Sequence, residues 1–182
     1  MRPPGTIGPG TSSINQGGLA VAEQQISSGA QAAADPRIRA VGVLLSASAL
    51  LEHQLGTAIQ REAGISHSMF EILLILAERP DGAPMSELSG RLVVTSGGAT
   101  RLVDRMVKAG LVERRPSPSD RRVQLVSMTE QGETALVRAA RAHVRETDRQ
   151  LYAALPPEEL TAMIGALDRV GRHARSLLPP LR

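Results

Sequence analysis

Arginine side chains gather in one short part of this 182-residue sequence. Between positions 91 and 122 there are eight basic residues against three acidic ones, a local charge of +5. The whole chain carries only +3, which leaves −2 for the remainder. Guanidinium groups donate paired hydrogen bonds to phosphate oxygens, and a concentrated positive field attracts polyanions. The stretch therefore favours binding of phosphate groups, as in a nucleic-acid backbone.

Chemistry of other kinds has little support in the sequence. There is no Gly-x-Ser-x-Gly nucleophile motif and no glycine-rich phosphate loop, so we expect no enzyme activity, no catalytic residue and no cofactor. The four histidines lack the spacing that would place two on one helix face, and cysteine is absent, so we expect no metal site. One Phe, one Tyr and no Trp cannot build a stacking platform for single strands, which leaves double-stranded DNA as the favoured partner.

The pattern of apolar residues indicates which elements position the basic side chains. A short helix that begins with Ser86 as its N-cap should end near Leu92, and a second helix should follow, capped by Thr95. In the second helix Ala99, Leu102, Val103 and Met106 recur at three- and four-residue spacing, so one stripe faces inward. The outward face then carries the expected DNA-contacting residues of this helix, which are Thr95, Ser96, Gly97, Gly98, Thr100, Arg101 and Arg105.

A basic hairpin follows the second helix. Gly110 stands where a helix-ending residue in the left-handed conformation belongs, and residues 111–114 and 123–126 alternate as half-buried strands do. A loop at 116–120 joins them. The hairpin adds Arg114, Arg115, Arg121 and Arg122 to the expected DNA-contacting residues. Helix, turn, helix and basic hairpin together predict a winged helix-turn-helix, whose second helix fits a DNA major groove about 12 Å wide.

The hairpin resembles the wing of the MarR (multiple antibiotic resistance regulator) family of bacterial transcription factors. The family pattern is roughly GLV-x-R, a short loop, DRR, a strand and LT-x-x-G. The matching residues here are Gly110, Leu111, Val112, Arg114, Asp120, Arg121, Arg122, Thr129 and Gly132. Met128 replaces the usual Leu, a swap that conserves volume. The resemblance extends more weakly over residues 35–178. It implies a sequence-specific regulator, most often a repressor, that binds a pseudo-palindromic promoter site as a homodimer.

The predicted contacts divide by element. On the second helix, Ser96, Gly97, Thr100 and Arg101 should face base edges. Arg105, Arg114 and Arg115 should contact phosphates, and Arg121 should reach the minor groove from the wing. Asp104 and Asp120 are expected to support the wing. In the family an acidic residue at the place of Asp104 pairs with a wing arginine, for which Arg122 is the expected partner here, although a solvated Asp104 is an equal alternative.

Long helices are predicted on both sides of this region. One helix should run over 36–63 and start at Asp35-Pro36. A second should run over 67–78 after a Ser66 cap, and it should be buried nearly all round. A third should run over 130–155 after a Thr129 cap, and a last helix should end at about 178. We expect a fold that is mainly α with a small antiparallel β-wing. The winged helix-turn-helix should span 66–128, and residues 1–34, rich in Gly, Pro, Ser, Gln and Ala, should be a disordered extension.

The apolar stripes of the helices over 36–63 and 130–178 are longer than one small domain can cover, whereas a second copy of the chain can cover them. The resemblance implies dimerisation through these first and last helices; the alternative is that the stripes pack within one chain. The resemblance also implies a small anionic or phenolic effector, for which His53, His67 and Phe70 are candidate pocket residues. Ordinary core packing is the alternative role for these three side chains.

The remaining expectations concern location and class. No apolar run is long enough to span a membrane and no signal peptide is evident, so we expect a cytoplasmic protein. A winged helix that serves only protein-protein interaction is the alternative function, but such a module has no need for four arginines around its wing. A winged helix attached to an enzyme would require a catalytic domain, which we do not expect after position 178.

Overall fold

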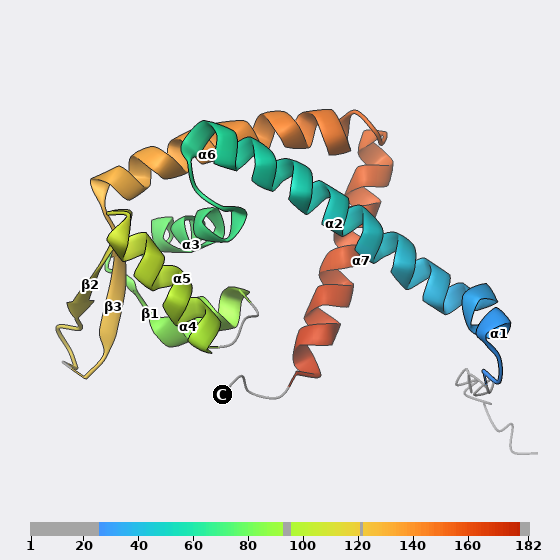
Figure 1. Ribbon diagram of the computed structural model, residues 1–182, viewed down its shortest axis with the longest axis horizontal. Helices are drawn as coiled ribbons and strands as arrows, with labels where there is room; N and C mark the ends of the chain where they lie inside the picture. The colour runs from blue at the N-terminus through green and yellow to red at the C-terminus, as the bar shows by residue number, and fades with distance from the viewer. Residues whose placement is uncertain (1–25, 93–95, 121, 179–182) are drawn as a thin grey trace, which may run out of the picture. The chain divides into compact units, whose positions relative to one another are not determined.

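The computed structural model describes residues 26–92, 96–120 and 122–178 (Figure 1). The elements in chain order are α1 (Gly29–Ala34), α2 (Pro36–Ala63), α3 (His67–Ala77), β1 (Ala83–Pro84), α4 (Met85–Leu92), α5 (Ser96–Lys108), β2 (Val112–Pro116), β3 (Gln124–Met128), α6 (Glu130–Thr147), the π-helix η1 (Asp148–Tyr152) and α7 (Pro157–Ser176). The predicted fold class, mainly helical with a small antiparallel sheet, is confirmed. Contacts divide the chain into two units, Met1–Val43 and Leu44–Arg182.

The first unit contains α1, which the sequence did not predict. The Ser28 hydroxyl caps it by accepting a hydrogen bond from the backbone N–H of Gln31 at 3.2 Å. The expectation of disorder over 1–34 is therefore wrong for 29–34, and residues 1–25 lie outside the described part. The Asp35 carboxylate accepts hydrogen bonds from the guanidinium (2.6 Å) and the backbone N–H (2.8 Å) of Arg37, which lower the pKa of Asp35 to about 2.

The second unit is built around α3. This helix begins where the Ser66 hydroxyl accepts a hydrogen bond from the backbone N–H of Met69 at 3.3 Å, as the capping pattern predicted. It contacts α4, α5, α6 and β3, and in Figure 1 it lies between α6 and the pair formed by α4 and α5. The largest fully buried side chains of the unit are Ile59, Ile72, Leu73, Leu88, Met106, Val103 and Val126. The prediction that α3 is buried nearly all round is wrong along one side of the helix, because Leu74 is 43% exposed and Ser68, Glu71 and Ala77 are exposed as well.

The sheet has three antiparallel strands in the order β1-β3-β2. In the hairpin Val112 pairs with Met128 and Pro116 with Gln124, while the short β1 aligns Ala83 with Val126. The sequence did not predict β1, because two residues that include a proline carry no strand pattern. Since α4 follows β1 directly and begins at Met85, Ser86 lies inside the first turn, and the prediction that it caps the helix is wrong.

The helix that follows the sheet starts where it was predicted. The Thr129 hydroxyl accepts a hydrogen bond from the backbone N–H of Gly132 at 3.0 Å. The helix expected to reach position 155 ends at Thr147, and the chain continues as one π-helical segment, η1. The last helix, α7, ends at Ser176. None of the described helices is both long enough and apolar enough to cross a membrane.

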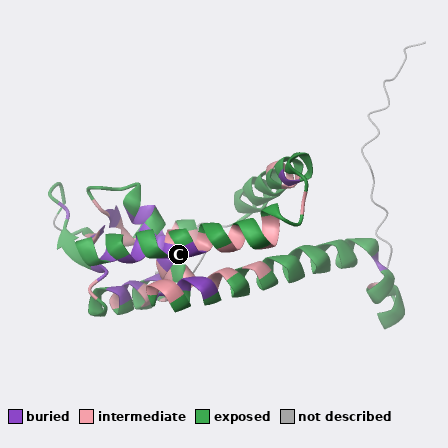
Figure 2. Cartoon of the chain, turned by 90° about the horizontal axis from the view of Figure 1, so that it is seen from above, coloured by how far each residue is buried: buried purple, intermediate pink, exposed green. Residues whose placement is uncertain are grey.

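Burial is distributed unevenly along the chain (Figure 2). Every residue from Pro36 to Leu50 in α2 is exposed, although that stretch is rich in apolar side chains. The large exposed apolar side chains of α2 are Ile38, Val41, Val43, Leu44, Leu45 and Leu50, and those of α7 are Ile164, Leu167 and Val170. The buried residues gather instead around α3 and the sheet.

Candidate nucleic-acid interface

Helix α5 presents a polar face to the outside because its apolar face packs against the core. Ala99, Val103 and Met106 are completely buried, as the spacing predicted, whereas Leu102 of the same predicted stripe is only half-buried. Thr100, Arg101 and Arg105 are exposed on the other side of the helix. Neither arginine forms an ion pair with another described residue, so both guanidinium groups are available to a ligand.

The start of α5 is only partly described. Thr95, the predicted cap, lies outside the described residues, and Ser96 begins the helix. Gly97 is exposed and Gly98 is half-buried. A Cβ added at Gly97 would meet no atom within 4 Å, so packing inside the described chain does not require glycine there. The missing side chain instead leaves the helix backbone accessible to a partner.

The wing is the hairpin of β2 and β3. Across its loop the backbone N–H of Ser117 donates to the carbonyl of Val123 at 2.8 Å, and the N–H of Val123 donates to the carbonyl of Asp120 at 2.9 Å. The Asp120 carboxylate accepts a hydrogen bond from the backbone N–H of Arg122 at 3.0 Å, which stabilises the turn at the tip. Arg122 is exposed, and Arg121 lies outside the described residues.

An ion pair ties the wing to α5. Nη1 of Arg114 lies 2.6 Å from Oδ1 of Asp104. The expected partner, Arg122, is wrong, because α5 contacts β2, the strand that carries Arg114. The neighbouring Arg115 donates a hydrogen bond to the carbonyl of Asp81 at 3.1 Å. Arg114 and Arg115 therefore both bond to other residues of the chain, and the charge of Arg114 is balanced by the Asp104 carboxylate.

Three residues of the wing motif form the junction between α5 and α6. Gly110 has a φ of +70°, the left-handed conformation predicted for the residue that ends α5. The Thr129 hydroxyl donates a hydrogen bond to the Gly110 carbonyl at 2.6 Å. A Cβ on Gly132 would lie 2.0 Å from the Leu111 carbonyl oxygen, so only glycine fits there. The motif thus fixes how the helix before the wing meets the helix after it.

The charge that remains for a partner is smaller than the count of basic residues suggests. Nη1 of Arg91 lies 2.7 Å from Oε2 of Glu78, and this hydrogen bond lowers the pKa of the Glu78 carboxyl. Arg91 and Arg114 are therefore neutralised locally. Among the described basic residues of this region, those that form no ion pair with another described residue are Arg101, Arg105, Lys108, Arg115 and Arg122. They lie on α5 and on the wing, where phosphate binding requires them.

The predicted effector residues lie near one another, but only two of them line a cavity. An open pocket of about 780 Å³ has His53 and Gly56 of α2 on one wall and Ser66 and His67 on another. Phe70 is only 4% exposed and lies behind this wall, with its ring centroid 6.2 Å from that of His67.

His143 of α6 completes this aromatic group. Its ring stacks on His67 at a centroid distance of 6.2 Å and an interplanar angle of 14°, and it lies 5.2 Å from the ring of Phe70. Burial, and then the charge of His67, lower the pKa of His143.

No group of acidic or histidine side chains among the described residues could hold a metal ion.

Comparisons with known proteins agree with this geometry. The model of the MarR family matches residues 65–123, which run from the start of α3 into the wing loop. The transcriptional regulator MhqR of Bacillus subtilis is 30% identical over 112 residues, covering 62% of this chain and 76% of its own length.

Two crystal structures from Streptomyces coelicolor resemble the fold closely. AbsC, a MarR family transcriptional regulator, superposes with a TM-score of 0.70 at 32% identity and covers 75% of this chain and 93% of its own. A second MarR family regulator, solved in complex with DNA, gives a TM-score of 0.70 at 31% identity and covers 80% of this chain and 90% of its own.

Proposed function

Because this chain belongs to the MarR family of winged helix-turn-helix transcriptional regulators, a non-enzymatic family, we propose that it is a homodimeric repressor. It would bind a pseudo-palindromic promoter site in the cytoplasm. The observation that carries the proposal is the outward face of α5, where Thr100, Arg101 and Arg105 are exposed beside a basic wing while the opposite face is completely buried. A relative of 31% identity has been solved in complex with DNA.

The proposed contacts follow from where the described side chains lie and, for Ser96 and Arg121, from the sequence pattern. Gly97, Thr100 and Arg101 would meet base edges in the major groove, together with Ser96 at the helix start. Arg105 and Arg115 would bind phosphates, and Arg121 would enter the minor groove from the wing. Arg114 has a smaller direct role than its position suggests, since its guanidinium is engaged with Asp104. It would set the position of the wing instead.

We propose that a second copy of the chain covers the exposed apolar side chains of the long helices. Ile38, Val41 and Leu45 share one stripe of α2, and each is at least 49% exposed in the single chain. A contiguous apolar surface of this kind marks an association site in a soluble protein. The winged helix-turn-helix of each copy, from α3 to β3, is here called its reading head. Two reading heads would then contact half-sites one helical turn apart, about 34 Å.

An effector would act through the pocket of His53 and His67. Imidazole groups can donate hydrogen bonds to a carboxylate or a phenol, and Phe70 lies close behind His67. Because α2 forms one wall and residues before and at the start of α3 form another, a bound anionic or phenolic molecule would change how the long helix meets the reading head. Such a ligand would weaken DNA binding by changing the spacing of the two heads.

A binding selection from randomised duplexes tests the function. Thr100→Ala and Arg101→Ala should relax the preference at particular base pairs, because a bidentate base contact discriminates by about 1–3 kcal/mol. Arg121→Ala should weaken binding to nearly every sequence and leave the central motif unchanged. Arg172→Ala, an exposed arginine of α7, is the control and should change neither property. A stable dimer that binds no duplex at low salt would overturn the proposal in favour of a protein-interaction module.

A further inference from the structure

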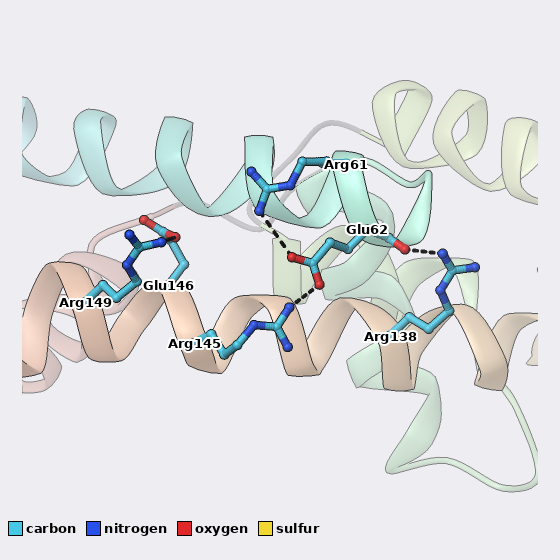
Figure 3. A network of polar contacts seen from close by, with 6 residues as sticks. All are labelled: Arg61, Glu62, Arg138, Arg145, Glu146 and Arg149. Atoms are coloured by element: carbon cyan, nitrogen blue, oxygen red, sulfur yellow. Dashed lines mark hydrogen bonds and ion pairs between the residues drawn. The ribbon is translucent and has the colours of Figure 1, made fainter.

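Four arginines and one glutamate lie together near the end of α2, beside α6. Figure 3 shows Glu62 with three of these arginines, Arg61, Arg138 and Arg145. The five residues line an open pocket of about 420 Å³, here called the arginine pocket, which is formed by Arg61, Glu62, Arg138, Arg141 and Arg145. The three α6 arginines follow one another at spacings of three and four residues, so they share one face of that helix. Arg61 and Glu62 face them from α2.

Glu62 is the only anion among the side chains of the arginine pocket. Its Oε1 accepts a hydrogen bond from Nη2 of Arg61 at 3.2 Å, and its Oε2 accepts one from the Arg145 guanidinium. Arg138 donates to the main-chain carbonyl of Glu62. The hydrogen bonds from Arg145 and then Arg61 lower the pKa of the Glu62 carboxyl, so it is charged at neutral pH.

The arginine pocket carries more positive charge than the hydrogen bonds between α2 and α6 require. One carboxylate against four guanidinium groups leaves three positive charges uncompensated among the lining side chains, and like charges this close repel one another. Arg141 is exposed and forms no ion pair or side-chain hydrogen bond with another described residue. The nearby carboxylate of Glu146 is occupied, because it accepts a hydrogen bond from Gln150 at 2.6 Å and lies 3.8 Å from Arg149.

We propose that the arginine pocket binds a small ligand with two or more adjacent phosphate groups, which takes the place of Glu62 between the guanidinium groups. Planar guanidinium groups bind phosphate oxygens in pairs, and several of them can grip a polyanion that a single arginine could not hold in water. DNA is a less suitable source of these phosphates. The helix α3 lies between α6 and α5, which separates the pocket from the reading face.

Calorimetric titration of the full-length chain with sodium pyrophosphate, at constant ionic strength, tests this site. We expect saturable binding of one pyrophosphate per chain. Arg141→Ala should weaken it about tenfold, because one charge-assisted contact is lost. Arg141 is exposed and forms no ion pair or side-chain hydrogen bond with another described residue, so the fold should be unaffected. The matched control is Arg149→Ala, which removes an arginine of η1 that lies four residues beyond Arg145 and outside the pocket, and it should leave the affinity unchanged.

The Glu62→Gln variant distinguishes a pocket that binds a ligand from a cluster of charges that only stabilises the fold. Removing the internal anion should strengthen pyrophosphate binding several-fold, because the ligand no longer competes with a carboxylate for the same guanidinium groups. Unchanged affinity in Arg141→Ala, or weaker binding in Glu62→Gln, would overturn the proposal. So would the absence of saturable binding, as expected if carboxylates of a second copy fill the pocket. A loss of duplex affinity in Arg141→Ala with pyrophosphate binding unchanged would assign the pocket to DNA instead.

Discussion

The reading head and the long helix α2 bury their apolar residues in opposite ways. In the head, Leu73, Leu88 and Val103 are completely buried within one chain. In α2 the whole stretch from Pro36 to Leu50 is exposed, and Leu45 retains 62% of its surface. The head therefore has a core of its own, whereas the apolar stripe of α2 needs a partner. Substitutions in the reading head should therefore change the free energy of unfolding, whereas substitutions in the apolar stripe of α2 should change the free energy of association.

The largest effect should come from the core of the head. Leu73→Ala removes a fully buried side chain of α3 and should lower the free energy of unfolding by about 2–5 kcal/mol. Its neighbour Leu74 is 43% exposed, and Leu74→Ala should cost well under half as much. Denaturant unfolding followed by circular dichroism measures both. Equal losses in the two variants would show that the head is not packed as described.

A smaller effect, on association alone, should follow from a charge on the α2 stripe. Leu45→Asp should weaken dimerisation by about 2 kcal/mol or more, roughly thirtyfold, because a carboxylate would be buried at the contact. Gln54→Asp places the same charge nine residues further along α2, on the opposite face of the helix, and is the control. Sedimentation velocity over a range of concentrations gives the dissociation constants. A dimer equally stable in both variants would place the interface elsewhere.

Sequence reasoning succeeded where local chemistry decides the structure. The caps at Ser66 and Thr129 were predicted because a hydroxyl can satisfy a free backbone N–H within three residues. Gly110 was identified by the same local logic. The buried stripe of α5 followed from helical spacing alone. These features need no knowledge of how distant segments meet.

The errors concern contacts between distant segments. Asp104 pairs with Arg114 instead of Arg122, and the choice depends on which strand of the hairpin lies against α5. The arginine pocket was missed for the same reason. Its three α6 arginines recur at helical spacing in the sequence, but Arg61 and Glu62 come from a helix far earlier in the chain. The strand β1 was missed because it exists only through its pairing with β3.

A pH titration tests the contact between the reading head and α6, where His143 of α6 stacks on His67 of α3. Burial lowers the pKa of His143, so the unfolded chain binds more protons than the folded one below about pH 6.5. The free energy of unfolding should therefore fall as the pH drops from 7 towards 5. His143→Gln should reduce this fall, and His173→Gln, at an exposed position of α7, should not. Unfolding curves at several pH values measure the difference, and identical slopes in all three proteins would contradict it.

The smallest effect on stability should come from the ion pair between α5 and the wing. The side chains of Asp104 and Arg114 are 45% and 31% exposed, so their coupling in a double-mutant cycle with Asp104→Asn and Arg114→Gln should be about 1 kcal/mol or less. The effect on DNA should be clearer, because a wing released from α5 must be ordered again on binding.

We therefore expect Asp104→Asn to lower duplex affinity several-fold while the preferred sequence stays the same, although it removes a negative charge that should otherwise help binding to phosphates. Glu78→Gln is the matched control, since it breaks the similarly exposed pair with Arg91, which does not involve the wing. Binding titrations at two salt concentrations separate the two influences. If Asp104→Asn bound DNA more tightly than wild type, simple charge removal would dominate, and the ion pair would have no role in positioning the wing.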